Sequence, residues 1–150
     1  MRAVIQRTTF SEVTIDRLEK KSMGSGLMIL VGIEESDALD DIDWLCGKIS
    51  RLRIFDDANG VMNLSVQDVR GEILVISQFT LHASTRKGNR PSYSRAAKPE
   101  TAEPLFLQFV NTLREVSGCR VESGKFGAYM QVHIVNDGPV TIIIDTKNKE

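Results

Sequence analysis

Apolar residues recur with two different periods along this chain of 150 residues. Residues 27–31 form an unbroken apolar run, and residues 73–76 form a second. Because a strand with one buried face alternates apolar and polar positions, unbroken runs predict strands that are covered on both faces. Residues 12–18 alternate instead, and together with residues 2–7 they predict two further strands near the start of the chain.

Two segments repeat their apolar positions at intervals of three and four, which is the spacing of one helix face. The first runs from Ala38 to Leu52, with Ser36 and Asp37 as candidate N-caps and acidic residues in its first turns. The second covers residues 101–116. Its predicted buried stripe consists of Leu105, Phe106, Phe109, Val110, Leu113 and Val116.

Strands return near the end of the chain, over residues 119–123, 129–135 and 140–145. Asn136-Asp137-Gly138-Pro139 predicts a turn between the last two. No Pro/Gly-rich linker divides the chain. The pattern therefore predicts one α/β domain over residues 1–150, layered α/β/β, with two main helices and a mixed, largely antiparallel sheet.

Composition and charge narrow the class of protein. Apolar residues make up 41% of the chain, charged residues 26%, and the formal net charge is −1. Such a balance argues against holding long stretches of nucleic acid by charge alone. No leader segment is recognisable and no apolar run could cross a membrane, so the cytoplasm is the expected location. Cys46 and Cys119 have no metal-ligand spacing, so we expect free thiols, no metal and no cofactor.

The first candidate site follows the buried run 73–76. Ser77, Gln78, Phe79 and Thr80 offer two hydroxyls, an amide and backbone N–H groups that could donate to an oxyanion. A strand end is a common place for a site, because the sheet holds its backbone while its tip meets solvent. The alternative is a strand end whose polar groups satisfy the next turn, and sequence spacing alone favours that interpretation.

A nucleophilic hydroxyl on Thr80 would need an adjacent base. The only histidines are His82 and His133. His82 follows Thr80 by two positions, so on a continuing strand the two side chains share a face. No acidic residue is placed to orient the imidazole, so a Thr80–His82 dyad is the weaker interpretation. His133 lies in an alternating segment and is expected on the surface.

The second candidate is the loop that continues from this strand end. Residues 84–98 contain five basic residues and no acidic one, with Arg86, Lys87 and Arg90 gathered near Gly88. Basic groups beside an aromatic ring, here Tyr93, suit RNA phosphates and stacked bases. The alternative is a solvated basic loop, and composition does not decide between the two.

The third candidate is the segment from Asn136 to Thr141. Asn-Asp-Gly is ordinary hairpin chemistry, which favours a simple turn. Pro139 complicates that interpretation, because it removes an N–H donor, fixes φ and permits a cis bond after Gly138. Aligned carbonyl groups at such a bend could receive an ammonium group.

Together these segments resemble the D-aminoacyl-tRNA deacylases, also called D-tyrosyl-tRNA deacylases. Residues 77–81 (SQFTL) are similar to the first signature of that family, and residues 136–141 (NDGPVT) are similar to the second. The likeness spans nearly the whole chain. It also includes residues 1–7, 52–57, 87–91 and 124–128.

The resemblance implies a homodimer that binds the aminoacylated end of tRNA, with no membrane or DNA partner. Gly138 and Pro139 would form a Gly-cisPro bend that enters the partner's active site, holds the substrate α-amino group and excludes an L side chain. Asn136 belongs to the same substrate-binding motif. Arg7 would brace the bend, and Met130 would pack near it.

The resemblance also implies where the chemistry lies. Residues 77–80 would line the pocket for the terminal adenosine, and the Phe79 N–H would contact the scissile ester. Attack by water would be assisted by the 2′-hydroxyl of the RNA, so Thr80 need not be a nucleophile. A filter that excludes side chains would also accept glycyl-tRNA. Two alternatives stay open: a non-catalytic RNA-binding dimer, and a relative with a trans bend and a wider pocket.

Overall fold

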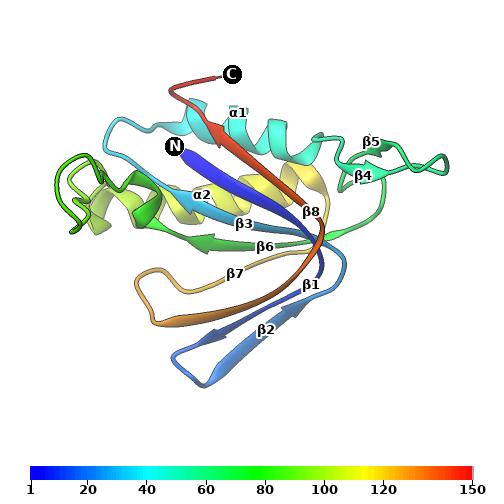
Figure 1. The fold of residues 1–150 in the computed structure, drawn as a ribbon, viewed down its shortest axis with the longest axis horizontal. Coiled ribbons are helices and arrows are strands. Elements are labelled where there is room, and N and C mark those ends of the chain that lie inside the picture. The colour runs from blue at the N-terminus through cyan, green and yellow to red at the C-terminus, as the bar shows by residue number, and fades with distance from the viewer. Residues whose placement is uncertain (150) are drawn as a thin grey trace.

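The computed structural model describes residues 1–149. Two helices lie on one side of a curled sheet, and a small hairpin projects from one end (Figure 1). The helices are α1 (Leu39–Ser50) and α2 (Pro99–Ser117), with a short 3-10 helix, η1 (Phe79–His82). The strands are β1 (Arg2–Ile15), β2 (Glu19–Met23), β3 (Gly26–Gly32), β4 (Phe55–Asp56), β5 (Met62–Leu64), β6 (Glu72–Ser77), β7 (Val121–Ser123) and β8 (Met130–Asp145).

The main sheet has the strand order β2-β1-β3-β6-β7, and β8 pairs with the other edge of β1. The strand β1 is antiparallel to β2, β3 and β8. The pairs β3–β6 and β6–β7 are parallel. The predicted mixed sheet with two main helices is therefore confirmed, and its curl brings β2 and the first half of β8 into a second layer (Figure 1).

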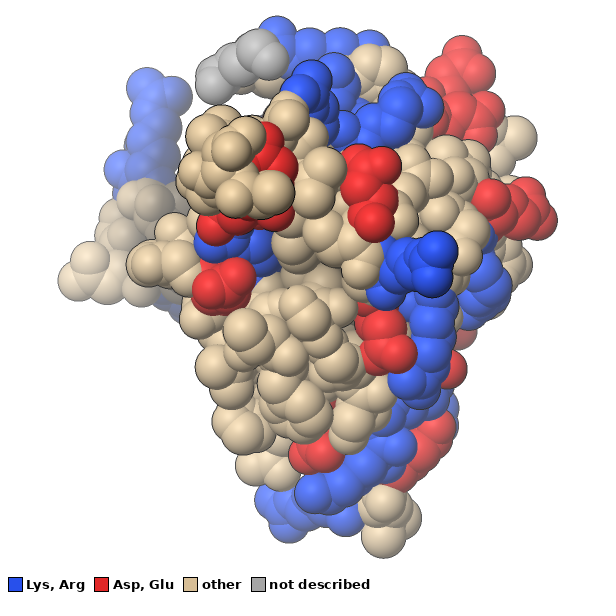
Figure 2. Space-filling model, turned by 90° about the vertical axis from the view of Figure 1, so that its right-hand side faces the viewer, with Lys and Arg blue, Asp and Glu red and all other residues tan. Residues whose placement is uncertain are grey.

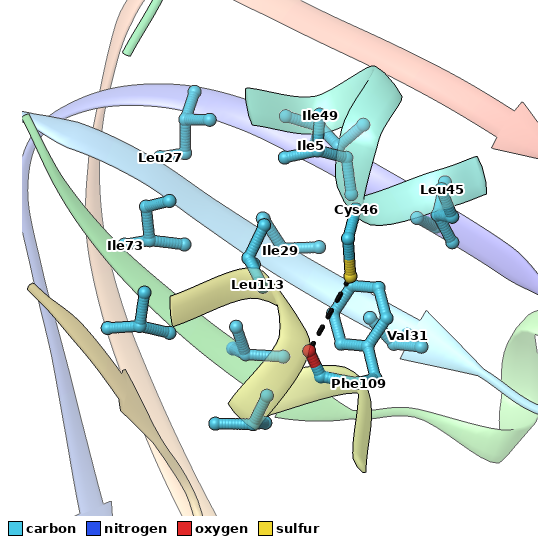
Figure 3. Close-up of a cluster of buried hydrophobic side chains, with 14 of the residues drawn as sticks. Ile5, Leu27, Ile29, Val31, Leu45, Cys46, Ile49, Ile73, Phe109 and Leu113 are labelled. Atoms are coloured by element: carbon cyan, nitrogen blue, oxygen red, sulfur yellow. Dashed lines mark hydrogen bonds between the residues drawn. The ribbon is translucent and has the colours of Figure 1, made fainter. Parts of the chain in front are cut away.

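The strand β3 is covered on both faces, as its unbroken apolar run predicts. Leu27, Ile29 and Val31 point toward α1 and α2, where they join the larger core (Figure 3). Met28 points the other way, into a smaller core inside the curl of the sheet. The two helices pack on each other in the larger core. There Cys46 is a free, buried thiol that donates to the Phe109 carbonyl at 3.5 Å, and burial raises the pKa of Cys46 to about 12.

Two predicted breaks in the strands are wrong. Residues 2–15 form the single strand β1, and residues 16–18 turn into β2. Likewise, β8 runs unbroken through residues 136–139, where a turn between two strands is predicted. The two strands stay paired on either side of the bend, where Thr141 lies opposite Gln6 and Asn136 opposite Thr8, and residues 137–140 form an irregularity in register between these pairs.

The helix ends also differ from the prediction in detail. The N-cap of α1 is Ala38, not Ser36 or Asp37. Asp37 is buried, and its carboxylate forms an ion pair with the terminal ammonium of Met1 instead of capping the helix. On α2, Val116 is exposed, so the predicted buried stripe ends at Leu113.

The chain end folds back onto the start of α1. Lys147 Nζ donates to the Asp41 carboxylate at 2.8 Å and to the Ser36 carbonyl at 2.9 Å. Asp41 also accepts from the Ala38 N–H at 2.9 Å. Partial burial raises the pKa of Asp41, but the hydrogen bonds from Lys147, Thr146 and Ala38 outweigh it and lower that pKa to about 2.

We expect the charge of Asp41 to stabilise the fold in a pH-dependent way. Its pKa is lower in the folded chain than the ordinary 3.8, so the stabilisation is present above pH 3.8 and is lost as the pH falls toward 2. Asp41→Asn keeps an acceptor for Ala38 but loses the charge. With solvent screening taken into account, it should lower the free energy of unfolding by about 1 kcal/mol at pH 7.

Urea unfolding of both proteins at pH 7, pH 4 and pH 2.5 measures this difference. The gap between wild type and variant should shrink at the lowest pH. A gap of equal size at all three values would show that the carboxylate charge contributes nothing and that the side chain acts only through its shape.

Candidate functional site

The segment 77–80 owes its position to the parallel pair β3–β6. That pair ends where Val31 lies opposite Ser77, and the Gln78 N–H then donates to the Val31 carbonyl at 2.8 Å. The chain next turns into η1, which carries Phe79 and Thr80. The predicted strand end is therefore confirmed, and its tip is a helical turn whose first N–H groups have no partner within the helix.

Gly32 lets this turn lie close against the end of β3. A Cβ atom there would be 2.9 Å from the Gln78 carbonyl oxygen and 3.0 Å from both Leu81 Cβ and His82 Cδ2. Backbone atoms cannot move aside as a flexible side chain can, so the close approach depends on the missing side chain. His82, the last residue of η1, is buried.

Thr80 has no base in this arrangement. Its Oγ1 accepts a hydrogen bond from Gln78 Nε2 at 2.5 Å. Both ring nitrogens of His82 are buried without any hydrogen-bond partner among the described residues. The expectation that Thr80 and His82 share a face fails because η1 replaces the continuing strand. The Thr80–His82 dyad is therefore absent from the structure.

A cavity of about 610 Å³ opens beside η1. Its lining includes Ser77, Gln78 and Phe79 from the first candidate segment, and Met130 from the start of β8. Thr80 lies outside this lining and faces a smaller cavity beside Arg2 and Ile143. The structure thus brings together four of the predicted site residues in one pocket and turns Thr80 away from it.

Three aromatic rings stand at this pocket with unusually large exposure. Phe79 is 56% exposed, Tyr93 40% and Tyr129 57%, and all three line the cavity. The rings of Phe79 and Tyr93 meet edge to face, with centroids 5.1 Å apart. Exposed aromatic faces are the means by which proteins stack unpaired bases. The sequence identifies Tyr93 only as part of a basic loop, and it gives no periodic signal for Tyr129.

The second motif lies elsewhere on the chain. None of residues 136–139 lines the pocket. Met130 does, and Gly138 follows it by eight positions on the same strand, which is up to about 26 Å of strand length. Met130 therefore does not pack near the bend of its own chain. The predicted site residues form two separate groups within one copy of the chain.

The bend itself is held by Arg7. The Gly138–Pro139 peptide bond is cis, and Gly138 has a φ of +116°. The buried Arg7 side chain donates to the Ile54 carbonyl at 2.7 Å and approaches Asp56 at 3.5 Å. Its Nε lies 3.0 Å from Asp137 Oδ2, in an ion pair whose N–H is not aligned for a hydrogen bond.

Steric fit explains why the position before Pro139 is a glycine. A Cβ on Gly138 would be 2.9 Å from Val140 Cγ2, 3.1 Å from the Val140 nitrogen and 3.3 Å from Arg7 Nη2. Arg7 thus lies against the bend, where the family resemblance places it. Asn136 begins the bend and lies opposite Thr8 on β1.

The predicted basic residues Arg86, Lys87 and Arg90 are exposed on a loop that is closed by pairing of Ser84 with Ser92. They do not line the pocket, although Tyr93, three positions after Arg90, does. On the face in Figure 2, acidic and basic side chains alternate around a broad uncharged area.

No helix of the described residues 1–149 has both the length and the apolar character to cross a membrane. The same part of the chain holds no cluster of three side chains suited to a metal ion.

Comparison with known proteins places the chain in a family. A family model described as D-Tyr-tRNA(Tyr) deacylase matches residues 4–145. A D-aminoacyl-tRNA deacylase of Bacteroides fragilis is 63% identical over 150 residues, and one of Bacteroides thetaiotaomicron is 61% identical, each over the full length of both chains. Among solved structures, the c-Myc DNA Unwinding Element Binding Protein aligns with a TM-score of 0.89 and 42% identity, covering 97% of this chain and 98% of that one.

These similarities cover both signature segments and the bend between Asn136 and Thr141. The resemblance drawn from the sequence is therefore confirmed, and the chain belongs to the D-Tyr-tRNA(Tyr) deacylase family, a family of hydrolases.

Proposed function

We propose that this deacylase cleaves the ester bond of D-aminoacyl-tRNA at a site shared by two copies of the chain. The observation that carries the proposal is the separation of the two signature segments: the pocket beside η1 contains Phe79 and Met130 but no part of the bend at Gly138. The bend of one copy would enter the pocket of the other, which is how an isologous dimer makes two equal sites.

The pocket suits the end of an RNA chain. It has room for a nucleoside, and aromatic rings stand at its mouth. The Phe79 N–H, at the first position of η1, would donate to the ester carbonyl as charge develops on its oxygen. Arg86, Lys87 and Arg90, on the loop that leads to Tyr93, would contact tRNA phosphates.

The chemistry would come from the backbone and the substrate. Thr80 faces away from the pocket and has no hydrogen-bonded base. Water attack assisted by the 2′-hydroxyl of the terminal nucleotide needs no side-chain nucleophile, and an activated ester needs chiefly positioning and oxyanion stabilisation.

Selectivity would come from the bend. The carbonyl groups beside Gly138 and Pro139 would hold the substrate ammonium, and the rigid backbone would leave no room for an L side chain. Glycine has no side chain to reject, so glycyl-tRNA would also be a substrate.

The activity itself has a direct test. Purified enzyme should release tyrosine from D-Tyr-tRNA at least a hundredfold faster than from L-Tyr-tRNA, because only the L side chain meets the bend. Release of labelled amino acid over time measures both rates. Equal rates would refute the chiral filter, and binding of tRNA without any ester loss would favour a non-catalytic RNA-binding dimer.

Complementation tests the sharing of the site. Gly138→Ala crowds the bend against Val140 and Arg7, and Ala96→Trp fills the pocket, so each homodimer should lose at least about 90% of its activity. In a heterodimer of the two variants, purified through two different tags, one site carries both defects and the other is intact. Its activity per dimer should return to about half that of the wild type.

The same heterodimer separates the alternatives. If pocket and bend act within one copy, each copy carries one defect and the heterodimer stays as inactive as its parents. Failure of the wild-type chain to form any dimer in solution would also contradict the shared site.

Thr80 provides a test of the chemical step. Thr80→Ala should keep kcat within about threefold of the wild type, because the lost hydroxyl accepts a hydrogen bond from Gln78 and is not a nucleophile. Thr80→Ser is the matched control, since it retains the hydroxyl. A loss of more than a hundredfold in the alanine variant alone, with an unchanged circular dichroism spectrum, would identify the hydroxyl as a catalytic group.

A further inference from the structure

The turn between β1 and β2 has an unusual residue at a left-handed position. Asp16 and Arg17 have φ values of +50° and +63°, and the Leu18 N–H closes the turn on the Ile15 carbonyl at 3.0 Å. Two consecutive left-handed residues make a tight hairpin turn in which glycine or asparagine is the common choice at the second position. A long cationic side chain stands there instead.

This turn touches the pocket through Tyr129. The Asp16 N–H donates to the Tyr129 carbonyl at 2.9 Å, and the Arg17 guanidinium lies 5.7 Å from the centre of the Tyr129 ring. Tyr129 lines the pocket and is more than half exposed. In Figure 1 the turn lies beside the start of β8, in agreement with the pairing of Ile15 with Met130.

Arg17 has no carboxylate partner within residues 1–149, where the salt bridges involve other basic groups. Its side chain is exposed, and the ring contact with Tyr129 is its one described interaction. A guanidinium over an aromatic ring keeps its N–H donors free at its edge, where they match a phosphate. A cation without a carboxylate partner therefore lies beside Tyr129, a ring that lines the pocket.

We infer that Arg17 binds a backbone phosphate of the single-stranded 3′ end of tRNA where the chain leaves the pocket. The inference rests on the proposed use of this pocket for the terminal nucleotide. Exposed rings at the mouth would stack bases, and Arg17 would neutralise the phosphate between them. This contact strengthens binding of the tRNA and has no part in the chemical step.

Arg17→Gly tests the inference cleanly, because glycine suits the left-handed backbone and the fold should not suffer. Arg70 offers a matched control: it is also exposed and also left-handed with a φ of +52°, but its described hydrogen bond is to Gln67, which does not line the pocket. Arg70→Gly removes the same charge and relieves the same strain of a left-handed backbone conformation. The melting temperature of neither variant should fall below that of the wild type.

With D-Tyr-tRNA, Arg17→Gly should raise KM about tenfold and leave kcat within about twofold, the scale of one lost charge-assisted contact. The slope of log KM against log salt should fall by about 0.7, the value for one phosphate of a single strand. Arg70→Gly should change neither KM nor the slope.

Wild-type values of KM and slope in Arg17→Gly would overturn the inference, and so would an equal change in both variants, which would indicate a general effect of net charge. The D-tyrosyl ester of adenosine, which has no phosphate, should be cleaved equally by wild type and Arg17→Gly. A wild-type enzyme that cleaves neither substrate would refute the proposed function, whereas cleavage of tRNA without any effect of Arg17 would refute only this contact.

Discussion

The hydrogen-bonded ladder between β1 and β8 is the constraint on which the site depends. It runs from Arg2 opposite Asp145 to Ile15 opposite Met130, so it spans nearly all of both strands. Met130 lies in the pocket at one end of β8, and the bend at Gly138 lies far along it. The ladder is irregular at the bend but pairs with β1 on both sides of it, so one copy holds its bend away from its pocket. The proposal that a second copy supplies the missing half follows from that rigidity.

The same ladder places the positive charge of Arg7 in a buried position, where a charge is costly. Arg7 is buried on β1, and its guanidinium donates to the Ile54 carbonyl and forms ion pairs with the carboxylates of Asp56 and Asp137 at the surface. Burying a cation without partners costs several kcal/mol, so these contacts explain why the loop at Ile54 and the bend at Asp137 stay together. The pocket beside η1 has no comparable buried ion pair among the described residues 1–149. It depends instead on close backbone packing, because Gly32 lies against the turn that leads into η1 and against the buried ring of His82 at its end.

The sequence predicts the parts of the fold that leave a local mark. Residues 27–31 and 73–76 are unbroken apolar runs because β3 and β6 are buried on both faces, and the two helices show their buried stripe. The breaks predicted within β1 and β8 fail for a non-local reason. Thr8 and Ser11 are polar yet buried, and residues 136–139 have hairpin chemistry although Asn136 and Thr141 pair with β1 on either side of the bend. The pocket also brings together Phe79, Tyr93 and Tyr129. Their proximity depends on tertiary packing, so no sequence motif predicts it.

Magnitudes explain why a filter of this kind belongs within a strand. Each factor of ten in discrimination between D and L substrates needs about 1.4 kcal/mol. For a thousandfold preference, displacing the bend to admit an L side chain must therefore cost about 4 kcal/mol. A bend held only by an exposed ion pair would yield for about 1 kcal/mol or less. Here the bend is also flanked by ladder pairs, with Asn136 opposite Thr8 and Thr141 opposite Gln6. Displacing it would break these hydrogen bonds as well as the buried contacts of Arg7. The stability of the sheet thus sets an upper limit on the chiral selectivity that the proposed filter can reach.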